Sequence, residues 1–254
     1  MKHLKKVWSY GGGTQTAAIA ALILDGRLPK PDIIVFADTG REISTTMKYY
    51  DKWIKPALSK IGLKIEIAPH SLSKVDLYRN GELLIPINTK TGRLSIFCSN
   101  EWKQRVIHRF LRQKHKVKHV EMWMGISTDE IGRMKDSNLK WIQNRYPLID
   151  LGISRNDCVD IVEKFGWQTP PKSSCWMCPY RSEWQWADMK KNQPEDFKKA
   201  VNLERDIRKQ PKYSDCTLFR GGRLDSVDFN SHTPPVQPSL FGQVEHCDSG
   251  ACWV

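Results

Sequence analysis

One short stretch decides how the fold is interpreted: Ser9-Tyr10-Gly11-Gly12-Gly13-Thr14-Gln15-Thr16. Before it, Lys5–Tyr10 predicts a strand, and after it Thr14–Leu24 predicts a helix. Adjacent glycines let the backbone approach a phosphate closely and adopt positive φ. The following helix presents unpaired N–H groups and the positive end of its dipole. The stretch therefore predicts a phosphate-binding loop between a strand and a helix.

The side chains of this loop add to its amides. Three hydroxyl groups, on Ser9, Thr14 and Thr16, are further donors for a phosphate. The loop contains no Gly-Lys-Ser/Thr of a Walker A motif and does not match the dinucleotide-binding fingerprint. A tight strand-to-helix turn without a ligand is the alternative. As nucleotide-binding residues we predict Ser9, Tyr10, Gly11, Gly12, Gly13, Thr14, Gln15 and Thr16.

Strands and helices alternate outward from this loop. Asp32–Asp38 is a nearly continuous run of β-branched and other apolar residues, which is typical of a strand buried on both faces. Leu63–Ala68 and Val120–Gly125 predict further strands, and Ile43–Lys60 and Asn100–Gln113 predict helices. This alternation implies right-handed crossovers within a mostly parallel sheet. We predict an α/β fold: a doubly wound, Rossmann-like parallel sheet with a helical C-terminal subdomain.

The pattern becomes helical after Ser154. Helices are predicted at Ser154–Phe165, around Ser182–Lys190 and at Pro194–Lys209, and the loop Gln168–Pro179 is rich in Pro, Ser and Cys. Residues 70–97 show no clear period beyond a short hairpin around residues 88–92. We therefore predict a nucleotide-binding α/β domain at 1–150, a helical subdomain at 151–229, and a linker with a cysteine-containing tail at 230–254.

Polar segments follow two of the predicted strands. Ligands of open α/β sheets bind beyond the carboxyl ends of the strands, so these segments should lie beside the glycine loop. Asp38 suits adenosine or a metal, or else it caps the next helix. Arg133 suits a phosphate, or else it pairs with Glu130, three positions away on a helix. Further nucleotide-binding residues predicted here are Asp38, Thr39, Gly40, Gly125, Ser127 and Glu130.

The strongly basic composition of the chain indicates which ligands and partners it favours. The formal net charge is +12, which favours polyanions, either nucleotides or nucleic acid. Lys103–His119 contains seven basic residues and no acid, and it either follows a nucleic-acid backbone or forms a solvated helix face. Lys103 is also placed to serve a phosphate or a substrate. No apolar run is long enough to cross a bilayer, so we expect a cytoplasmic protein without a membrane partner.

Several motifs occur in an order that resembles one family. After the glycine loop and Phe36–Gly40 come Phe97-Cys98 with Lys103, then Gly125–Glu130 with Arg133, Arg145–Leu148 and Ser174–Pro179. This order, over roughly residues 5–210, resembles the PP-loop adenine nucleotide α-hydrolases. Within them it resembles the phosphoadenosine phosphosulfate (PAPS) reductase-like branch found in phages and mobile elements. The family loop usually reads Ser-Gly-Gly-x-Asp-Ser. Here the acidic position is absent.

The resemblance implies that ATP or PAPS lies across the strand ends, with Mg²⁺ on its phosphates. In ATP-using members of the family, a substrate attacks the α-phosphate and gives an adenylate and pyrophosphate. The candidate catalytic residues in this chain are Ser9, Lys103 and Arg133, with Cys247 for an alternative reaction.

A Cys-x-x-Cys pair, Cys175 and Cys178, follows Cys98 at a distance. Iron–sulfur adenylylsulfate reductases resemble this chain in placing a cysteine pair at a comparable point before a Cys-x-x-Cys. The resemblance implies a [4Fe-4S] cluster on these three cysteines, either with an open iron or with a fourth ligand from Cys252 or Cys247. Zinc with mixed Cys and His ligands and buried apolar cysteines are the alternatives.

The tail does not match the C-terminal motif of PAPS reductases, Glu-Cys-Gly-Leu/Ile-His. Even so, Glu245-His246-Cys247 places a base beside a thiol, so Cys247 is the candidate nucleophile of a reductase. Cys158 and Cys216 are expected in the core.

Three functions remain open at this point. The preferred prediction is activation of an acceptor at the α-phosphate of ATP, with sulfur transfer from the cysteine site to a nucleobase or nucleic acid. The first alternative is a thiol-dependent PAPS or adenylylsulfate reductase that uses thioredoxin. The second is a nucleotide-binding accessory protein of a mobile-element or defence system with little turnover. The products distinguish them: AMP with pyrophosphate, sulfite, or neither.

Overall fold

The computed structural model describes residues 4–229, which form two compact units. The first unit contains residues 4–74 and 102–173, and the second contains residues 75–101 and 174–229. This division differs from the boundary at residue 150 that the sequence suggested, because residues 75–101 group with the C-terminal part and residues 151–173 group with the sheet. The predicted linker and tail at 230–254 lie outside the described residues.

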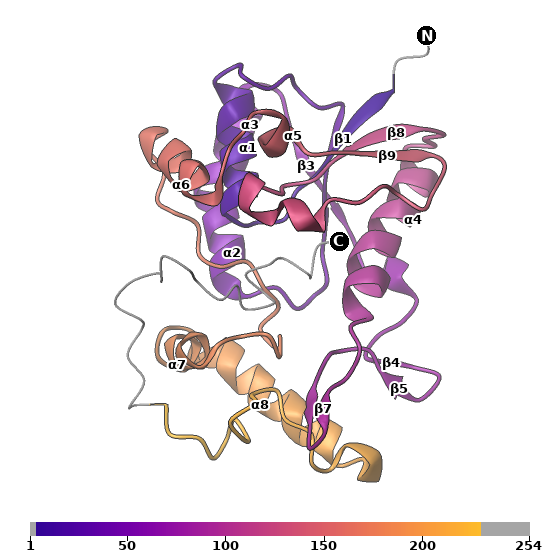
Figure 1. Cartoon of the computed structure of the whole chain (residues 1–254), viewed down its shortest axis with the longest axis vertical. Helices are drawn as coiled ribbons and strands as arrows, with labels where there is room; N and C mark the ends of the chain where they lie inside the picture. Colours follow the sequence, from indigo (N-terminus) through magenta and orange to yellow (C-terminus); the bar gives the residue numbers. More distant parts are fainter. Residues whose placement is uncertain (1–3, 230–254) are drawn as a thin grey trace. The chain divides into compact units, whose positions relative to one another are not determined.

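The first unit is built around a five-stranded sheet in which all neighbouring strands are parallel (Figure 1). Its strands are β1 (Lys5–Ser9), β2 (Ile33–Ala37), β3 (Ile65–Ala68), β8 (Val120–Trp123) and β9 (Ile142–Arg145). The spatial order is β3-β2-β1-β8-β9, which confirms the predicted doubly wound fold. The direction of winding reverses between β1 and β8, and sheets of this kind bind ligands beyond the carboxyl ends of the strands at that point.

Helices cover both faces of this sheet. α4 (Arg105–Lys114), preceded by the π-helical segment η3 (Ser99–Gln104), packs Val106, Phe110 and Leu111 against one face. Burying a side chain of this size contributes about 1.5–3 kcal/mol. Right-handed crossovers place the helices that connect β1, β2 and β3 on the opposite face.

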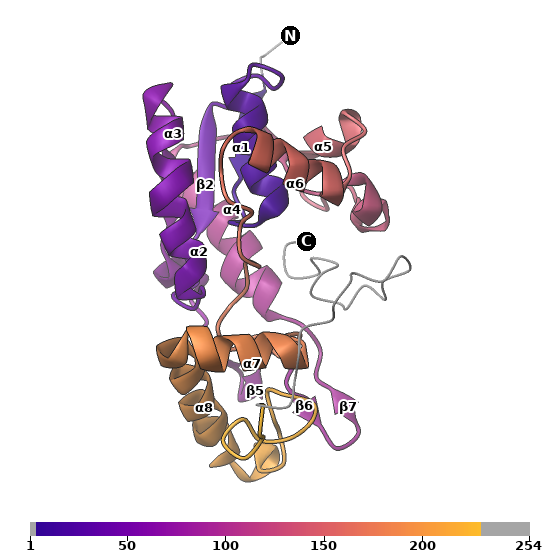
Figure 2. The ribbon, with the colours of Figure 1, turned by 90° about the vertical axis from the view of Figure 1, so that its left-hand side faces the viewer.

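The helices of this opposite face begin with α1 (Thr14–Leu24), which packs along α6 (Arg155–Lys164) (Figure 2). Next comes a nearly continuous helix made of α2 (Ser44–Tyr49), the π-helical segment η1 (Tyr50–Ile54) and α3 (Lys55–Lys60). Shorter elements complete the unit: η2 (His70–Ser73), η4 (Thr128–Arg133) and α5 (Pro147–Asp150).

The second unit combines two small hairpins with two helices. Its elements are β4 (Tyr78–Arg79), β5 (Glu82–Leu83), β6 (Asn88–Thr89), β7 (Gly92–Arg93), α7 (Glu183–Asn192), α8 (Pro194–Arg208) and η5 (Pro211–Tyr213). Asn88 joins the two parts of the unit, because its side-chain amide donates to the carbonyls of Thr217 and Leu218 at 3.1 and 3.0 Å. Contacts of this kind explain why residues 75–101 group with the C-terminal part.

β9 was not predicted from the sequence. Only Ile142 of its four residues is buried, so the segment has no apolar run, and its pairing with β8 defines it as a strand. Within residues 4–229, no helix combines the length and the apolar character needed to span a membrane.

Candidate functional site

The loop between β1 and α1 presents a row of backbone amides. Gly13 is the N-cap of α1, no side chain caps the helix, and its first turn contains no acidic residue. The amides from Gly11 to Thr16 donate no hydrogen bond to any acceptor among the described residues. A helix start with several unpaired amides and no negative charge suits an anion. The loop between β1 and α1 therefore presents the unpaired amides that the sequence predicts there.

Gly12 determines the shape of this loop. Its φ of +75° lies in the left-handed region that favours glycine. A Cβ at this position would lie 2.7 Å from Thr46 Cγ2 and 3.3 Å from Ser173 Oγ. Ser173 also donates a hydrogen bond of 2.6 Å to the carbonyl of Gly11. Ser173 therefore holds the loop and Thr46 lies close against it, and neither residue was predicted to have this role from the sequence.

The loop after β8 closes on the start of α1. A Cβ on Gly125 would lie 2.9 Å from Thr16 Cγ2, so this close approach requires glycine. Gln15 Nε2 donates a hydrogen bond of 3.2 Å to Glu130 Oε2. Gly125 and Glu130 therefore lie at the start of α1, beside the row of amides.

The charged side chains of this second loop pair with one another. Arg133 Nη1 lies 2.8 Å from Glu130 Oε1, and only 15% and 8% of the two side chains are exposed. Burial raises the pKa of the Glu130 carboxyl, although the neighbouring charge of Arg133 acts in the opposite direction. Ser127 Oγ donates to Asp129 Oδ2 at 3.0 Å. Of the two roles considered for Arg133, the ion pair with Glu130 is the one observed.

The segment after β2 forms a tight turn. Asp38 Oδ1 accepts a hydrogen bond of 2.8 Å from the amide of Gly40, whose φ is +65°. Asp38 therefore does not have the capping role considered for it, because α2 begins after Ile43 without any side-chain cap. Thr39 Oγ1 donates to Glu42 Oε1 at 3.2 Å. Because β2 lies beside β1 and runs parallel to it, this turn and the glycine loop both lie at the carboxyl ends of the strands.

Lys103 is buried next to this turn. Its Nζ lies 3.8 Å from Glu42 Oε1, and the two side chains are 7% and 3% exposed. The neighbouring Arg41 lies over the ring of Trp102 at 4.4 Å. Lys103 was predicted as a site residue from the sequence, whereas Glu42, the buried carboxylate that holds it, was not. The lysine charge at this end of β2 is thus fixed in position.

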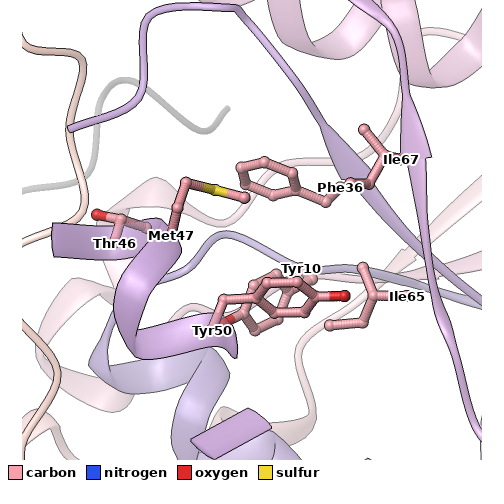
Figure 3. A pocket seen from close by; sticks show the side chains of 7 residues that line it. All are labelled: Tyr10, Phe36, Thr46, Met47, Tyr50, Ile65 and Ile67. Carbon is pink, nitrogen blue, oxygen red and sulfur yellow. The ribbon is translucent and has the colours of Figure 1, made fainter. Parts of the chain in front are cut away.

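Ser9 and Tyr10 connect the sheet to the loop. Ser9 ends β1 opposite Val35, and the amide of Tyr10 donates to the carbonyl of Val35 at 2.9 Å. The ring of Tyr10 packs against Phe36 and Tyr50 beside a cavity of about 10 Å³, enough for roughly one water molecule (Figure 3). Burial raises the pKa of the Tyr10 hydroxyl far above its usual range. The side chain of Tyr10 therefore belongs to the core.

The basic residues around α4 are largely engaged within the protein. Arg109 Nη1 donates to the carbonyl of Ser73 at 2.7 Å, and Arg112 lies over the ring of Trp141 at 4.3 Å. Lys114 forms an ion pair with Glu66. These contacts supply structural roles for part of the predicted nucleic-acid stretch.

The cysteines divide into two groups. Cys158 and Cys216 are buried as predicted, and burial raises the pKa of the Cys158 thiol to about 12. Cys175 and Cys178 lie in one tight turn, because the amide of Cys178 donates to the carbonyl of Cys175 at 3.1 Å. Cys98 is half-buried in the same unit.

The predicted metal site lies only in part within the described residues, because Cys252 is outside them. Nowhere between residues 4 and 229 do three or more His, Cys, Asp or Glu side chains group closely enough to hold a metal ion. The Cys-x-x-Cys turn on its own supplies two of the four ligands that a [4Fe-4S] cluster or zinc requires. Cys247 and Cys252, the candidate nucleophile and the candidate fourth ligand, lie outside the described residues.

Comparisons with known proteins do not identify a family for this chain. No family model matches the sequence, and no curated protein matches it. Among solved structures, the chain is similar to the U34-tRNA thiolase NcsA from Methanococcus maripaludis with its [4Fe-4S] cluster. The two are 13% identical with a TM-score of 0.45, over 89% of this chain and 73% of that one. At these values the likeness is too weak to assign an activity.

Proposed function

We propose that the protein is an enzyme that binds ATP by its phosphates at the loop between β1 and α1 and acts at the α-phosphate. One observation carries the proposal: the run of unpaired amides from Gly11 to Thr16, placed beside the point where the sheet reverses its winding. Amides fixed in this way stabilise the negative charge that develops on a phosphate during reaction, and they need no reorganisation to do so.

In the proposed reaction, an acceptor nucleophile attacks the α-phosphorus of ATP. The bond between the α-phosphorus and the bridging oxygen breaks, and pyrophosphate leaves with the electron pair. The acceptor keeps the adenylyl group and loses its proton to solvent or a base. Mg²⁺, when bound with ATP, neutralises charge on the phosphates.

No group of three or more candidate ligands is found among the described residues, so Mg²⁺ would be held mainly by the phosphates of the nucleotide. Mg²⁺ is usually held by one or two carboxylates together with substrate phosphates and water, rather than by a protein cage. Asp38 directly follows β2 and, like the glycine loop, lies at the carboxyl ends of the strands. We therefore propose its carboxylate as the protein ligand of Mg²⁺. Lys103, fixed beside Glu42, is proposed to face the substrate at the same edge.

The acceptor is proposed to be a nucleic acid, on the basis of the net charge of +12. Sulfur transfer from a cysteine-bound cluster is a separate proposal, which the turn of Cys175 and Cys178 supports only in part. Iron content after anaerobic purification tests it, with Cys175→Ser as the variant. An iron-free protein, or equal iron in both proteins, would remove it.

The products of the reaction test the main proposal. The protein is incubated with ATP and Mg²⁺, with and without RNA or DNA, and the nucleotides are separated by chromatography. Pyrophosphate is expected, together with an adenylylated acceptor, or with AMP once water or a second nucleophile has displaced the adenylyl group. ADP with phosphate would contradict attack at the α-phosphate, and binding without turnover would identify an accessory protein. Sulfite release from PAPS with thioredoxin would identify the reductase.

A further inference from the structure

β3 is an edge strand whose outer side has no neighbour among the described residues. It pairs with β2 alone. The carbonyl of Ala68 accepts a hydrogen bond from the amide of Asp38 on the β2 side. Backbone groups alternate in direction along a strand, so those of Ile65 and Ile67 point away from β2. An open edge of this kind is a template for pairing with another strand.

A groove of about 740 Å³ follows this edge. Apolar side chains line it, and among them Ile67 is 45% exposed. The lining also contains equal numbers of acidic and basic residues: Asp32, Asp51 and Glu66 with Lys55, Lys64 and Lys114. The whole chain carries a net charge of +12, which keeps copies apart. The groove is locally balanced, so it is a surface on which two copies can meet without that repulsion.

We propose that this edge is an interface between two copies of the chain, in which the two β3 strands pair antiparallel about a two-fold axis. Every contact of such an interface occurs twice. With the axis at Ile65, Leu63 and Lys64, which directly precede β3, extend the pairing: Lys64 lies opposite Glu66 of the other copy, and Ile67 lies opposite Leu63 of the other copy. The amide of Leu63 already donates to the carbonyl of Leu58 at 3.0 Å, so this last pair contributes through its side chains. Opposite charges and apolar pairs across neighbouring strands both stabilise a sheet.

Charge also selects the register. A shift that pairs Ile65 with Ile67 of the other copy would place the two Glu66 carboxylates opposite one another, which is unfavourable. Glu66 is fixed at the edge by Lys114 and by His115, whose Nε2 lies 3.1 Å from Glu66 Oε1. The carboxylate is therefore already in position when a second copy approaches. The proposal does not depend on the nucleotide site, which lies at the carboxyl ends of the strands.

Sedimentation of the full chain over a wide range of concentrations tests the interface. A reversible monomer–dimer equilibrium is expected. Ile67→Lys places a charge in the middle of the interface and is expected to raise the dissociation constant by about tenfold or more. Leu151→Lys is the matched control, because Leu151 is equally exposed at 45% and lies away from β3. A chain that remains monomeric, or equal dimerisation of the two variants, overturns the proposal.

Mixing two charge variants tests the register. Lys64→Glu alone and Glu66→Lys alone each place like charges opposite one another in both cross-strand pairs, so each is expected to be mainly monomeric. A mixture of the two restores opposite charges in both pairs and is expected to form heterodimers in native mass spectrometry. Circular dichroism confirms that each variant is folded. If both variants are folded but their mixture does not associate, the proposed register is wrong. If the protein pairs with an unrelated extended peptide and not with a second copy of itself, the proposed self-pairing is wrong.

Discussion

Gln15 in the first turn of α1 is joined to Glu130 in the loop after β8 by a hydrogen bond of 3.2 Å, although the two residues are 115 positions apart in the sequence. This contact links the two loops that flank the point where the sheet reverses its winding. The loop after β8 is therefore connected to the first turn of α1, where the row of amides lies.

The coupling between Gln15 and Glu130 is measured by a double-mutant cycle. Gln15→Ala, Glu130→Ala and the double variant are compared by denaturant unfolding. We expect a coupling energy of about 1 kcal/mol, because the cycle removes the effect of Glu130→Ala on Arg133 and isolates the hydrogen bond. The same cycle in ATP affinity should show coupling of the same sign. Additive effects in both measurements would show that the two loops are independent.

Gly12→Ala is expected to abolish most ATP binding. Alanine at a φ of +75° costs about 1–2 kcal/mol, and the new Cβ would also lie 2.7 Å from Thr46 Cγ2. Gly26→Ala is the control, because Gly26 has a φ of +77° and no atom within 4 Å of an added Cβ. Both variants should lose stability in denaturant unfolding. Calorimetric titration with ATP should show weaker binding for Gly12→Ala only, and equal affinities would contradict a phosphate site at this loop.

Gly125→Ala tests the close approach of the two loops without backbone strain, because Gly125 does not have positive φ. The added Cβ meets Thr16 Cγ2 at 2.9 Å, and we expect overpacking to cost about 1–3 kcal/mol of unfolding free energy. Thr16→Ser removes that methyl group and keeps the hydroxyl that donates to Gly13 at 2.8 Å. The double variant should therefore recover most of the loss. If it is no more stable than Gly125→Ala, the clash lies elsewhere.

Local pattern was enough to predict the sheet and the start of α1 after the glycines. The apolar run at Asp32–Asp38 specifies a buried strand, and the glycines before Thr14 specify a helix start with free amides, since both features depend on neighbouring residues. β9 could not be found in this way. Its residues are mostly polar, and only pairing with β8 orders them as a strand.

Contacts between distant segments were beyond sequence reasoning. Ser173 and Thr46 shape the loop at Gly12, and Glu42 holds Lys103, yet none of these residues belongs to a recognisable motif. Their roles arise because the crossovers bring segments that are distant in the sequence together at the carboxyl ends of the strands. The polar residues of Gly125–Arg133 were predicted to lie near the loop, but spacing offered the pair of Arg133 with Glu130 only as one of two alternatives, and the structure shows that it forms.

Acid is expected to destabilise the fold through His108. Burial lowers the pKa of this imidazole to about 4, and the charge of Arg112 adds to the effect. The unfolded chain takes up a proton near the ordinary pKa of about 6.5, whereas the folded protein does not until the pH approaches 4. Stability from this group is therefore present above pH 6.5 and is lost progressively between 6.5 and 4, with a loss of about 2 kcal/mol at pH 5.

Denaturant unfolding of the protein and of His108→Gln at pH 7.5 and pH 5 measures this loss. The variant should show a smaller fall in unfolding free energy between the two pH values, by about 2 kcal/mol, because glutamine does not titrate. His119→Gln is the matched control for the substitution itself, since His119 is exposed. An equal fall in the protein and in His108→Gln would mean that other groups cause the acid sensitivity, and that His108, whose ring lies 5.6 Å from that of Trp141, is protonated in the folded state at little cost.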